Sequence, residues 1–263
     1  MVAEEKVLFD VVDGVAAVTL NRPDKANAMD LEVMETLMRL AITCDEDREV
    51  RAVVITGAGK FFSAGGDMAS FQDAGDNAGA LVKEMTTHYH AAISRFSRMD
   101  APIIAAVNGM AAGAGFSLAA ACDLSIAAES AKFLSAYTAG ARSPDGSSTY
   151  FVPRLIGTRR AMELFLTNRR LSAAEALEWG LINRVVPDDD LMAETMALAR
   201  ELADGPTLAF GQVKSLMHHS LSGTLETQME LEARGIAAMS HTRDAIEGAV
   251  AFLEKRPPNY EGR

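Results

Sequence analysis

The sequence has only two cysteines, Cys44 and Cys122, among its 263 residues. Two thiols are too few for a disulfide framework and are typical of a protein of the reducing cytoplasm. The first ten residues, MVAEEKVLFD, also lack the basic region with which a signal peptide begins. We therefore expect a cytoplasmic protein that is not exported.

Positive charge is also in short supply. Lysine and arginine number 25 against 36 acidic residues, which leaves a net charge of −11 and a pI of about 5.0. Such a surface repels nucleic acid and anionic membranes, so neither is expected as a partner. Any polyanionic ligand has to be held by a local group of basic residues.

A membrane span is not expected either, although residues 101–122 carry no charge and are long enough to suggest one. Pro102, Asn108 and Gly109 interrupt this run, and Gly113 and Gly115 follow them. The pattern favours a buried strand, a turn and a buried helix. Hydrophobic residues make up 49% of the chain and charged residues 23%, as in an ordinary soluble globular protein.

Familiar metal, nucleotide and nucleophile motifs are missing. Five histidines include His88 and His90, but no H-E-x-x-H motif occurs, so no metal site is expected. Gly59 and Lys60 are followed by phenylalanine rather than by the serine or threonine of a phosphate loop. Residues 113–115 read Gly-Ala-Gly without the third glycine of a dinucleotide fingerprint, and no Gly-x-Ser-x-Gly elbow is present.

Hydrophobic periodicity predicts strands that alternate with helices as far as residue 135, and helices alone from Thr158 onward. Asp13 and Gly14 predict the turn of a hairpin, and Asp30 predicts the N-cap of the first helix. The predicted strands are 7–12, 15–20, 52–56, 103–107, 124–128 and a short one at 132–135.

Further helices are predicted around residues 82–96 and from about Gly115. Ser172 and Glu175 form a capping box, and Gly180 ends the helix that it begins. The last predicted helices are 188–203, 207–221, 224–240 and about 243–255. Strands alternating with helices, followed by a helical tail, indicate a parallel-rich α/β core with an α-helical C-terminal part. The apolar faces of that tail indicate that it packs on a neighbour.

Three loop-like segments are dense in small residues: GAGKFFSAGGDM (57–68), NGMAAGAGFS (108–117) and SPDGSSTY (143–150). Each of the first two follows a predicted strand and leads toward a helix, which leaves free backbone N–H groups at a helix start. Two such groups facing one point form an oxyanion hole, which stabilises an enolate or a tetrahedral intermediate. The same glycines also suit tight strand-to-helix turns, and the spacing alone leaves both interpretations open.

Asp145 lies in the third of these segments, where Pro-Asp-Gly is first of all the sequence of a turn. In such a turn proline presets φ, aspartate bonds its own backbone and glycine takes a positive φ. A catalytic role for Asp145 becomes the better interpretation only if other carboxylates are missing where the rest of the chain builds a site.

Four segments in order, NRPDKANAMD, FFSAGGDM, AAVNGMAAGAGFSLAAACDLSIAAESAKF and EGAVAFLEKRPPNYEGR, resemble the crotonase (enoyl-CoA hydratase/isomerase) superfamily from about residue 7 to residue 263. The resemblance implies an α/β crotonase fold. Its spiral core of ββα units would span residues 1–200, and an α-helical region at 201–263 would form trimers, often paired into hexamers. The implied substrate is an acyl-CoA thioester, with coenzyme A as part of the substrate and no bound cofactor.

By motif match, the resemblance assigns the oxyanion-hole N–H groups to Gly66 and Ala114, in agreement with the interpretation of the two glycine-rich loops. It also implies a CoA site, to which loops around residues 71–85 and 137–142 would add the walls of the acyl pocket. The residues that match CoA-site positions are Lys25, Ala26, Ala64, Gly66, Asp67 and Met68. Phe252 and Lys255 match residues of the C-terminal helix that reach CoA, in some members across a subunit interface.

The sequence departs from the family at the two glutamates that hydratases use, whose positions hold Ser117 and Tyr137. Syn-addition of water to a double bond needs groups that activate the water and deliver the α-proton. Serine beside tyrosine is a poor substitute for either group, so plain hydratase activity is not expected. Asp145 is the one carboxylate left at a matched catalytic position.

Two branches of the superfamily lack both glutamates and place an aspartate at the position of Asp145: the ring-1,2-epoxyphenylacetyl-CoA isomerase and 4-chlorobenzoyl-CoA dehalogenase. In the isomerase branch the carboxylate shuttles a proton or assists ring opening, and Tyr137 would be a pocket wall. In the dehalogenase branch the carboxylate attacks an aromatic carbon. There His90 matches the histidine that activates water, and Tyr89 and Tyr137 match tryptophans of the aryl pocket.

We predict an enoyl-CoA or ring-epoxide isomerase of fatty acid or aromatic degradation, because double-bond migration is the commoner activity and the pocket tryptophans are absent. An aryl-CoA dehalogenase or hydrolase, with Asp145 as nucleophile and His90 as base, is the alternative. A catalytically silent acyl-CoA-binding oligomer is a third interpretation. The direction of the Asp145 carboxylate, toward the thioester or toward solvent, separates the active from the silent interpretations.

Overall fold

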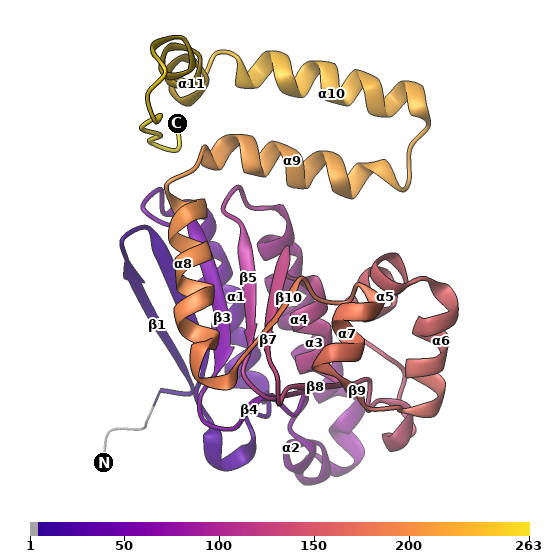
Figure 1. Cartoon of the computed structure of the whole chain (residues 1–263). Coiled ribbons are helices and arrows are strands. Elements are labelled where there is room, and N and C mark those ends of the chain that lie inside the picture. The colour runs from indigo at the N-terminus through magenta and orange to yellow at the C-terminus, as the bar shows by residue number, and fades with distance from the viewer. Residues whose placement is uncertain (1–4) are drawn as a thin grey trace.

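The computed structural model describes residues 5–263, in which helices pack around a large and a small β-sheet (Figure 1). The large sheet has six strands in the order β1-β2-β3-β5-β7-β10, and the small sheet has four in the order β4-β6-β8-β9. The prediction that the protein is not exported depends on the first ten residues, and residues 1–4 of these lie outside the described part of the chain. The cytoplasmic location stays a prediction.

Neighbouring strands are parallel except for β1 with β2 and β8 with β9. The parallel-rich α/β core that the sequence predicts is therefore confirmed. The strands are β1 (Val7–Val12), β2 (Val15–Leu20), β3 (Ala52–Gly57), β4 (Phe61–Ser63), β5 (Ile103–Val107), β6 (Met110–Ala112), β7 (Leu124–Ala128), β8 (Lys132–Leu134), β9 (Leu171–Ser172) and β10 (Arg184–Val186).

The helix boundaries follow the capping signals of the sequence. Asp30 accepts a hydrogen bond from the Val33 N–H, Ser172 and Glu175 form the predicted capping box, and Gly180 ends its helix with φ at 82°. The α-helices are α1 (Leu31–Glu46), α2 (Met68–Asp73), α3 (Ala78–Arg98), α4 (Ala114–Ala121), α5 (Ser148–Ile156), α6 (Thr158–Thr167), α7 (Ala173–Trp179), α8 (Leu191–Ala203), α9 (Thr207–Ser220), α10 (Leu225–Met239) and α11 (Arg243–Glu254). Short 3₁₀ helices are η1 (Pro23–Lys25), η2 (Gly75–Asn77), η3 (Thr138–Gly140) and η4 (Asp188–Asp190).

The prediction that only helices follow Thr158 is wrong, because β9 and β10 lie in that part of the chain. These strands have two and three residues, which is too short for a period-2 pattern to show in the sequence. They form through pairing at sheet edges, where Leu171 lies opposite Phe133 of β8 and Val186 lies opposite Ala128 of β7. Tertiary pairing, rather than local propensity, decides these strands.

Successive segments of the core each add one strand to each sheet. β3 is followed by β4, β5 by β6 and β7 by β8, and the first strand of each pair joins the large sheet while the second joins the small one. α2 and α3 follow β4, and α4 follows β6. This repeat is the spiral of ββα units that the resemblance implies. Because β4, β6 and β8 are parallel neighbours, their carboxyl ends meet at one edge of the small sheet.

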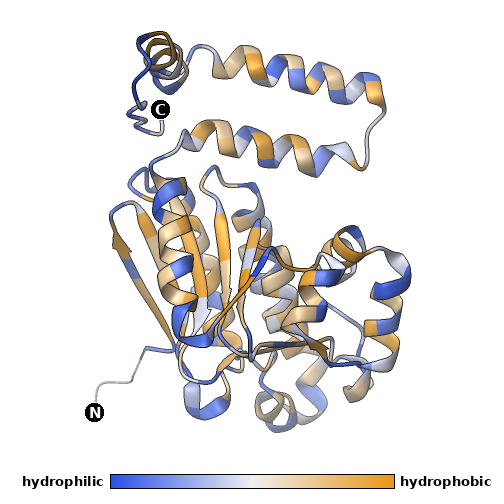
Figure 2. Ribbon diagram, in the orientation of Figure 1, coloured by the Kyte–Doolittle hydropathy of each residue, from blue (hydrophilic) through white to orange (hydrophobic). Residues whose placement is uncertain are grey.

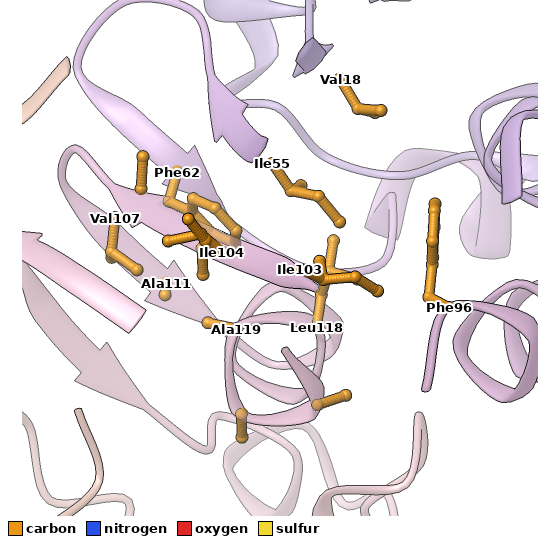
Figure 3. Close-up of a cluster of buried hydrophobic side chains, with 14 of the residues drawn as sticks. Val18, Ile55, Phe62, Phe96, Ile103, Ile104, Val107, Ala111, Leu118 and Ala119 are labelled. Carbon is orange, nitrogen blue, oxygen red and sulfur yellow. The ribbon is translucent and has the colours of Figure 1, made fainter. Parts of the chain in front are cut away.

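The hydrophobic core lies between the two sheets and the helices. β3 and β5 are buried along their whole length, and Figure 3 shows Ile55, Ile103 and Ile104 from these strands close to Phe62 of β4 and Leu118 of α4. The uncharged run 101–122 forms β5, β6 and the fully buried α4, much as its proline and glycines indicate. Within residues 5–263, no helix has the length and apolar character needed to cross a membrane.

The C-terminal helices differ in how closely they contact the core. Lys214 of α9 is buried, with its Nζ 2.8 Å from Asp123 Oδ2 and hydrogen-bonded to the carbonyls of Phe96 and Ala101 at 3.1 and 3.0 Å. Beyond α9, both α10 and α11 stand apart from the sheets (Figure 1). A boundary between core and C-terminal region at residue 200 stays a prediction, since α9 is bound to the core.

Candidate active site

A cavity of about 830 Å³ opens beside the small sheet. Its size is that of a pocket for a drug-sized ligand. The walls come from the segments that follow β4, β6 and β8, together with α1, α2 and α3. The lining residues are Met34, Ala64, Gly66, Met68, Phe71, Ala78, Gly79, Val82, Met85, Thr86, Gly113, Ala114, Ala136, Tyr137, Ala139, Gly140, Arg142, Ser143 and Asp145.

The topology of the small sheet brings the two glycine-rich loops together. In the parallel ladder Ser63 of β4 lies opposite Ala111 of β6, and Ala112 lies opposite Leu134 of β8. Segments that leave the carboxyl ends of neighbouring parallel strands emerge side by side. Gly66 and Ala114, each within three residues of its strand, therefore line the same cavity, with Tyr137 next to them.

The backbone of these two loops is in direct contact. A Cβ on Gly65 would lie 2.8 Å from the Ala112 carbonyl oxygen and 3.1 Å from the Ala114 nitrogen, and Gly65 has φ at 95°. Gly113, with φ at 53°, turns the chain from β6 into α4. The small residues are therefore required by close approach, as well as by the turns, so the two interpretations of these loops are compatible.

Two backbone N–H groups of these loops are available to a ligand. Ala114 is the first residue of α4, a position whose N–H has no partner within the helix. Within residues 5–263, neither the Ala114 N–H nor the Gly66 N–H donates to a protein acceptor. Both residues line the cavity, and the positive end of the α4 dipole adds to the attraction for an oxyanion.

Asp145 is held in the cavity wall by a hydroxyl network. The Tyr137 hydroxyl donates to Asp145 Oδ1 at 2.5 Å and lies 2.7 Å from Ser117 Oγ, while Ser117 Oγ donates to the Asp145 carbonyl at 3.0 Å. Burial, together with the neighbouring Asp145 carboxylate, raises the pKa of Tyr137, so this hydroxyl stays protonated and donates. In the described part of the chain, no group donates to Asp145 Oδ2.

The turn that carries Asp145 differs in detail from the predicted one. Gly146 has the expected positive φ, at 58°, and Ser147 follows with φ at 66°. The Asp145 carbonyl accepts from the Ser148 N–H at 3.2 Å and from the Ser148 hydroxyl at 2.8 Å, so the turn spans residues 145–148. The aspartate side chain bonds Tyr137 rather than its own backbone. The carboxylate lines the cavity.

His90 and Tyr89 do not line this cavity. The His90 side chain lines a second cavity, of about 690 Å³, and its Nε2 accepts a hydrogen bond from the Gly146 N–H at 3.2 Å. Tyr89 is fully buried and donates to the Ala114 carbonyl at 2.5 Å. The structure thus places these side chains behind the wall that carries Asp145, whereas Tyr137 is part of that wall.

The other matched CoA-site residues fall in three places. Ala64 and Met68 line the cavity. Asp67 is buried instead, where its Oδ2 lies 2.9 Å from Nη1 of Arg22 and its Oδ1 caps α2. Both carboxylate oxygens thus have partners within the protein, and Asp67 is not part of the cavity lining.

Lys25 and Ala26 lie next to the cavity rather than in its wall. Lys25 is exposed in η1, and the carbonyl of Ala26 accepts from the Ala64 N–H at 2.9 Å. Ala64 lines the cavity, so this bond connects the residue that follows Lys25 to the cavity wall.

Phe252 and Lys255 lie far from the cavity of their own chain. Phe252 of α11 is 83% exposed, and Lys255 follows it in a left-handed conformation. Figure 1 shows α11 and α2 at opposite ends of the molecule. Within one chain these residues cannot contact a ligand in the cavity.

Several lining residues come from outside the matched motifs. The predicted pocket segments 71–85 and 137–142 supply Phe71, Val82, Met85 and Arg142 to the lining, and their role as walls of an acyl pocket stays a prediction. Met34 of α1 was missed, because its helical spacing predicts only a core face. Arg142 is the one basic side chain among the described residues of the lining, and its guanidinium lies 5.1 Å from the centre of the Phe71 ring. Among residues 5–263, no group of three or more His, Cys, Asp or Glu is arranged to hold a metal ion.

Comparison with known proteins connects this geometry to a family. A match to the family described as enoyl-CoA hydratase/isomerase covers residues 10–263. The chain is 38% identical to 1,2-epoxyphenylacetyl-CoA isomerase of Escherichia coli, over 98% of this chain and 99% of that protein. It is 37% identical to 4-chlorobenzoyl coenzyme A dehalogenase-1 of an Arthrobacter species, over 90% of this chain and 86% of that protein. The crystal structure of enoyl-CoA hydratase from Bacillus anthracis matches with a TM-score of 0.92 at 34% identity, over 98% of this chain and all of that one.

Proposed function

The chain belongs to the enoyl-CoA hydratase/isomerase family and has the crotonase fold, and from this premise we propose that it is an acyl-CoA isomerase that uses Asp145 as acid and base. One observation carries the proposal. Asp145 is the only carboxylate among the described residues that line the cavity, and the free N–H groups of Gly66 and Ala114 line the same cavity.

The two N–H groups supply the oxyanion hole of the proposed reaction. Bound to the thioester oxygen, they stabilise the negative charge that develops when a proton leaves the α-carbon. Removal of an α-proton from a 3-enoyl thioester gives a dienolate, and return of the proton to the γ-carbon gives the 2-enoyl product. The proton is conserved, so the reaction needs one base that can also act as an acid.

Asp145 suits this role because its two carboxylate oxygens have different partners. Oδ1 accepts from Tyr137, which keeps the carboxylate in one orientation, and Oδ2 has no donor among the described residues. A fixed carboxylate with one free oxygen is able to take a proton at one carbon and release it at another. Ser117 and Tyr137, which occupy the hydratase glutamate positions, contribute hydroxyls that orient this carboxylate.

Nucleophilic attack by Asp145 on an aryl-CoA is the second candidate, which the similarity to 4-chlorobenzoyl coenzyme A dehalogenase-1 supports. That mechanism needs a base for the water that releases the aryl ester. His90, the matched residue, lines the neighbouring cavity, and its Nε2 already accepts from Gly146. This placement favours the isomerase.

A screen of acyl-CoA esters, aliphatic and aromatic, tests the proposal by mass spectrometry of both product and enzyme. Isomerisation leaves the substrate mass unchanged, hydration adds water, and dehalogenation replaces chlorine by hydroxyl. We expect a product of unchanged mass and shifted double bond or opened epoxide, with no adduct on the enzyme. Hydration as the main reaction, or no conversion of any ester despite binding, contradicts the proposal; the second result would indicate a silent acyl-CoA binder.

We further propose that Lys25 and Lys255 hold the phosphates of coenzyme A, since an acidic chain must bind them with local basic residues. Replacing either lysine by alanine should weaken binding of a CoA ester by about 1–2 kcal/mol, as for a charge-assisted contact. Isothermal titration calorimetry measures this, with Lys132→Ala, an exposed lysine of β8, as the control. If both variants bind like the wild type, the phosphates lie elsewhere.

The exposed apolar surface of α9–α11 supports a trimer or a hexamer. Figure 2 shows hydrophobic residues along α9 and α10. Single chains rarely expose so much apolar surface. A neighbouring subunit would cover it and bring α11 to another cavity, where Lys255 could reach CoA. The large apolar side chains that are at least half exposed here are Val213, Met217, Leu221, Leu225, Met229, Ile236, Ile246, Phe252 and Leu253.

Light scattering at micromolar concentration should therefore give the mass of a trimer or hexamer. The double variant Leu225→Asp with Ile236→Asp should shift the protein toward the monomer, because it places charge in the covered surface. Val12→Asp, on the exposed face of β1, is the control and should not change the mass. A monomeric wild-type protein contradicts this prediction.

A further inference from the structure

The turn at residues 145–148 separates the two cavities of the core. Asp145 lines the candidate active site, whereas Ser147 and His90 line the second cavity. Among the side chains that line the second cavity from outside the turn, within residues 5–263, His90 is the one that hydrogen-bonds the turn, and its Nε2 accepts from the Gly146 N–H at 3.2 Å. We propose that His90 is a positioning residue that holds the Asp145 turn through its unprotonated Nε2, so that protonation of His90 releases the turn. The inference rests on the proposed role of Asp145.

The peptide unit between Asp145 and Gly146 is held at both ends. Its carbonyl oxygen accepts from Ser117 Oγ at 3.0 Å and from the N–H and hydroxyl of Ser148 at 3.2 and 2.8 Å. Its N–H donates to His90 Nε2. Because a peptide unit is planar, these contacts fix its orientation and with it the direction in which the Asp145 side chain leaves the backbone.

The Gly146 N–H has no good alternative within the protein. Gly146 is buried, and a Cβ on it would lie 2.5 Å from the ring of Tyr89 and 2.9 Å from Ser117 Cβ. The surrounding side chains leave little room for the peptide to rotate toward another acceptor. A buried N–H that loses its acceptor is unfavourable, so the turn depends on His90.

Only the neutral imidazole can make this contact. An acceptor Nε2 carries no proton, which places the single ring proton on Nδ1. The imidazolium form has a proton on both nitrogens, so it would set one N–H against another. Protonation of His90 therefore replaces an attractive contact at Gly146 by a repulsive one.

The other groups around His90 do not substitute for it. In the second cavity, His218 Nε2 donates to the Ser97 carbonyl at 3.0 Å, and His219 Nδ1 donates to the Ser215 carbonyl at 2.7 Å. The titratable and charged side chains that line the second cavity with His90 are Arg98, Tyr150, His218 and His219, and the centre of the Tyr89 ring lies 6.4 Å from that of the His90 ring.

The closing experiment compares His90→Gln with His90→Leu in the full-length protein. Gln can place its carbonyl oxygen near the position of Nε2, so it accepts from Gly146 but does not titrate, whereas leucine has no acceptor. His88→Gln is the control, because His88 lies on the same helix with its Nε2 3.7 Å from Glu35. ¹⁵N NMR measures the His90 titration, the Gly146 amide shift and the scalar coupling across the N–H···N hydrogen bond.

In the wild type we expect the coupling to be present at high pH and to disappear with the same midpoint as the His90 titration. The chemical shift of the Gly146 amide should change with pH at that same midpoint in the wild type and in His88→Gln. In His90→Gln this change should be absent. The kcat of the wild type should fall as the pH is lowered through the midpoint of the His90 titration, and the kcat of His90→Gln should not show this fall. At high pH, His90→Leu should turn over about 10- to 100-fold more slowly than the wild type.

Two results overturn the inference: no coupling between Gly146 and His90 in the wild type, or a Gly146 amide that is indifferent to His90→Leu. A third is a His90→Gln enzyme as defective as His90→Leu, which is what a role of His90 as base predicts. The NMR measurements need no turnover. If no acyl-CoA is converted, the proposed function fails, and the NMR result still decides whether His90 holds the turn.

Discussion

Replacing Asp145 by asparagine should reduce turnover on a reactive acyl-CoA ester by about 10²–10⁴-fold, the scale on which general acid–base groups contribute. The affinity for the CoA ester should stay nearly unchanged. Asparagine keeps the size of aspartate, and its carbonyl oxygen can still accept from the Tyr137 hydroxyl that donates to Oδ1 in the wild type. The variant therefore removes the base and leaves the turn in place.

The measurement pairs single-turnover kinetics with calorimetry of a CoA ester. Asp189→Asn, in the exposed η4, makes the same chemical change away from the cavity and should behave as the wild type. An Asp145→Asn enzyme with unchanged activity on every reactive ester would rule out Asp145 as base and as nucleophile. SPDGSSTY would then be only a turn.

The same position separates the two catalytic mechanisms. If Asp145 is a nucleophile, wild-type enzyme quenched during turnover on an aryl-CoA should carry a covalent adduct on Asp145, visible by peptide mass spectrometry. Slower hydrolysis of the ester in His90→Gln should make the adduct accumulate. If Asp145 is a base, neither enzyme carries an adduct.

Replacing Ala114 by proline should lower kcat by about 10²–10³-fold, because it removes one donor of the oxyanion hole. Ala114 is the first residue of α4, where proline is well tolerated since its missing N–H has no helical partner. Within the described residues the Ala114 N–H donates to no protein acceptor, so its removal should cost a hydrogen bond to the ligand and none within the protein.

The proline ring also occupies space near the thioester oxygen, so a second measurement is needed. Free coenzyme A has no thioester oxygen, and its affinity should be the same for the wild type and Ala114→Pro. Ala114→Gly keeps the N–H and should retain most of the activity. The assignment of the oxyanion hole is wrong if Ala114→Pro turns over an acyl-CoA as fast as Ala114→Gly.

Much of the fold could be read from local patterns. The hairpin at Asp13 and Gly14, the N-cap at Asp30 and the capping box at Ser172 all formed where predicted, because each depends on contacts within a few residues. β4, β6, β9 and β10 were not predicted. These four strands, of two or three residues each, carry too little pattern, and they exist because a neighbouring strand pairs with them.

The candidate site divides in the same way. The free N–H groups follow from chain order, since strand, glycine loop and helix leave such groups at a helix start whatever lies nearby. That Gly66 and Ala114 share one cavity depends on β4 and β6 being neighbours in a sheet. The partners of a side chain depend on still more distant packing. Asp67 is paired with Arg22, 45 positions earlier in the chain, and does not line the cavity.

By itself, the sequence determined the acidic composition, the order and type of most elements, the two glycine-rich loops and the lack of glutamate at the positions that the resemblance assigns to the hydratase glutamates. These are properties of residue types and of spacings along the chain. Only the tertiary structure decided which oxygen of Asp145 is held by Tyr137, and that His90 reaches Gly146 from a separate cavity. Both contacts depend on how α3 and the 137–148 segment pack against α4, and directional hydrogen bonds over 2.5–3.2 Å are set by that packing rather than by the local chain.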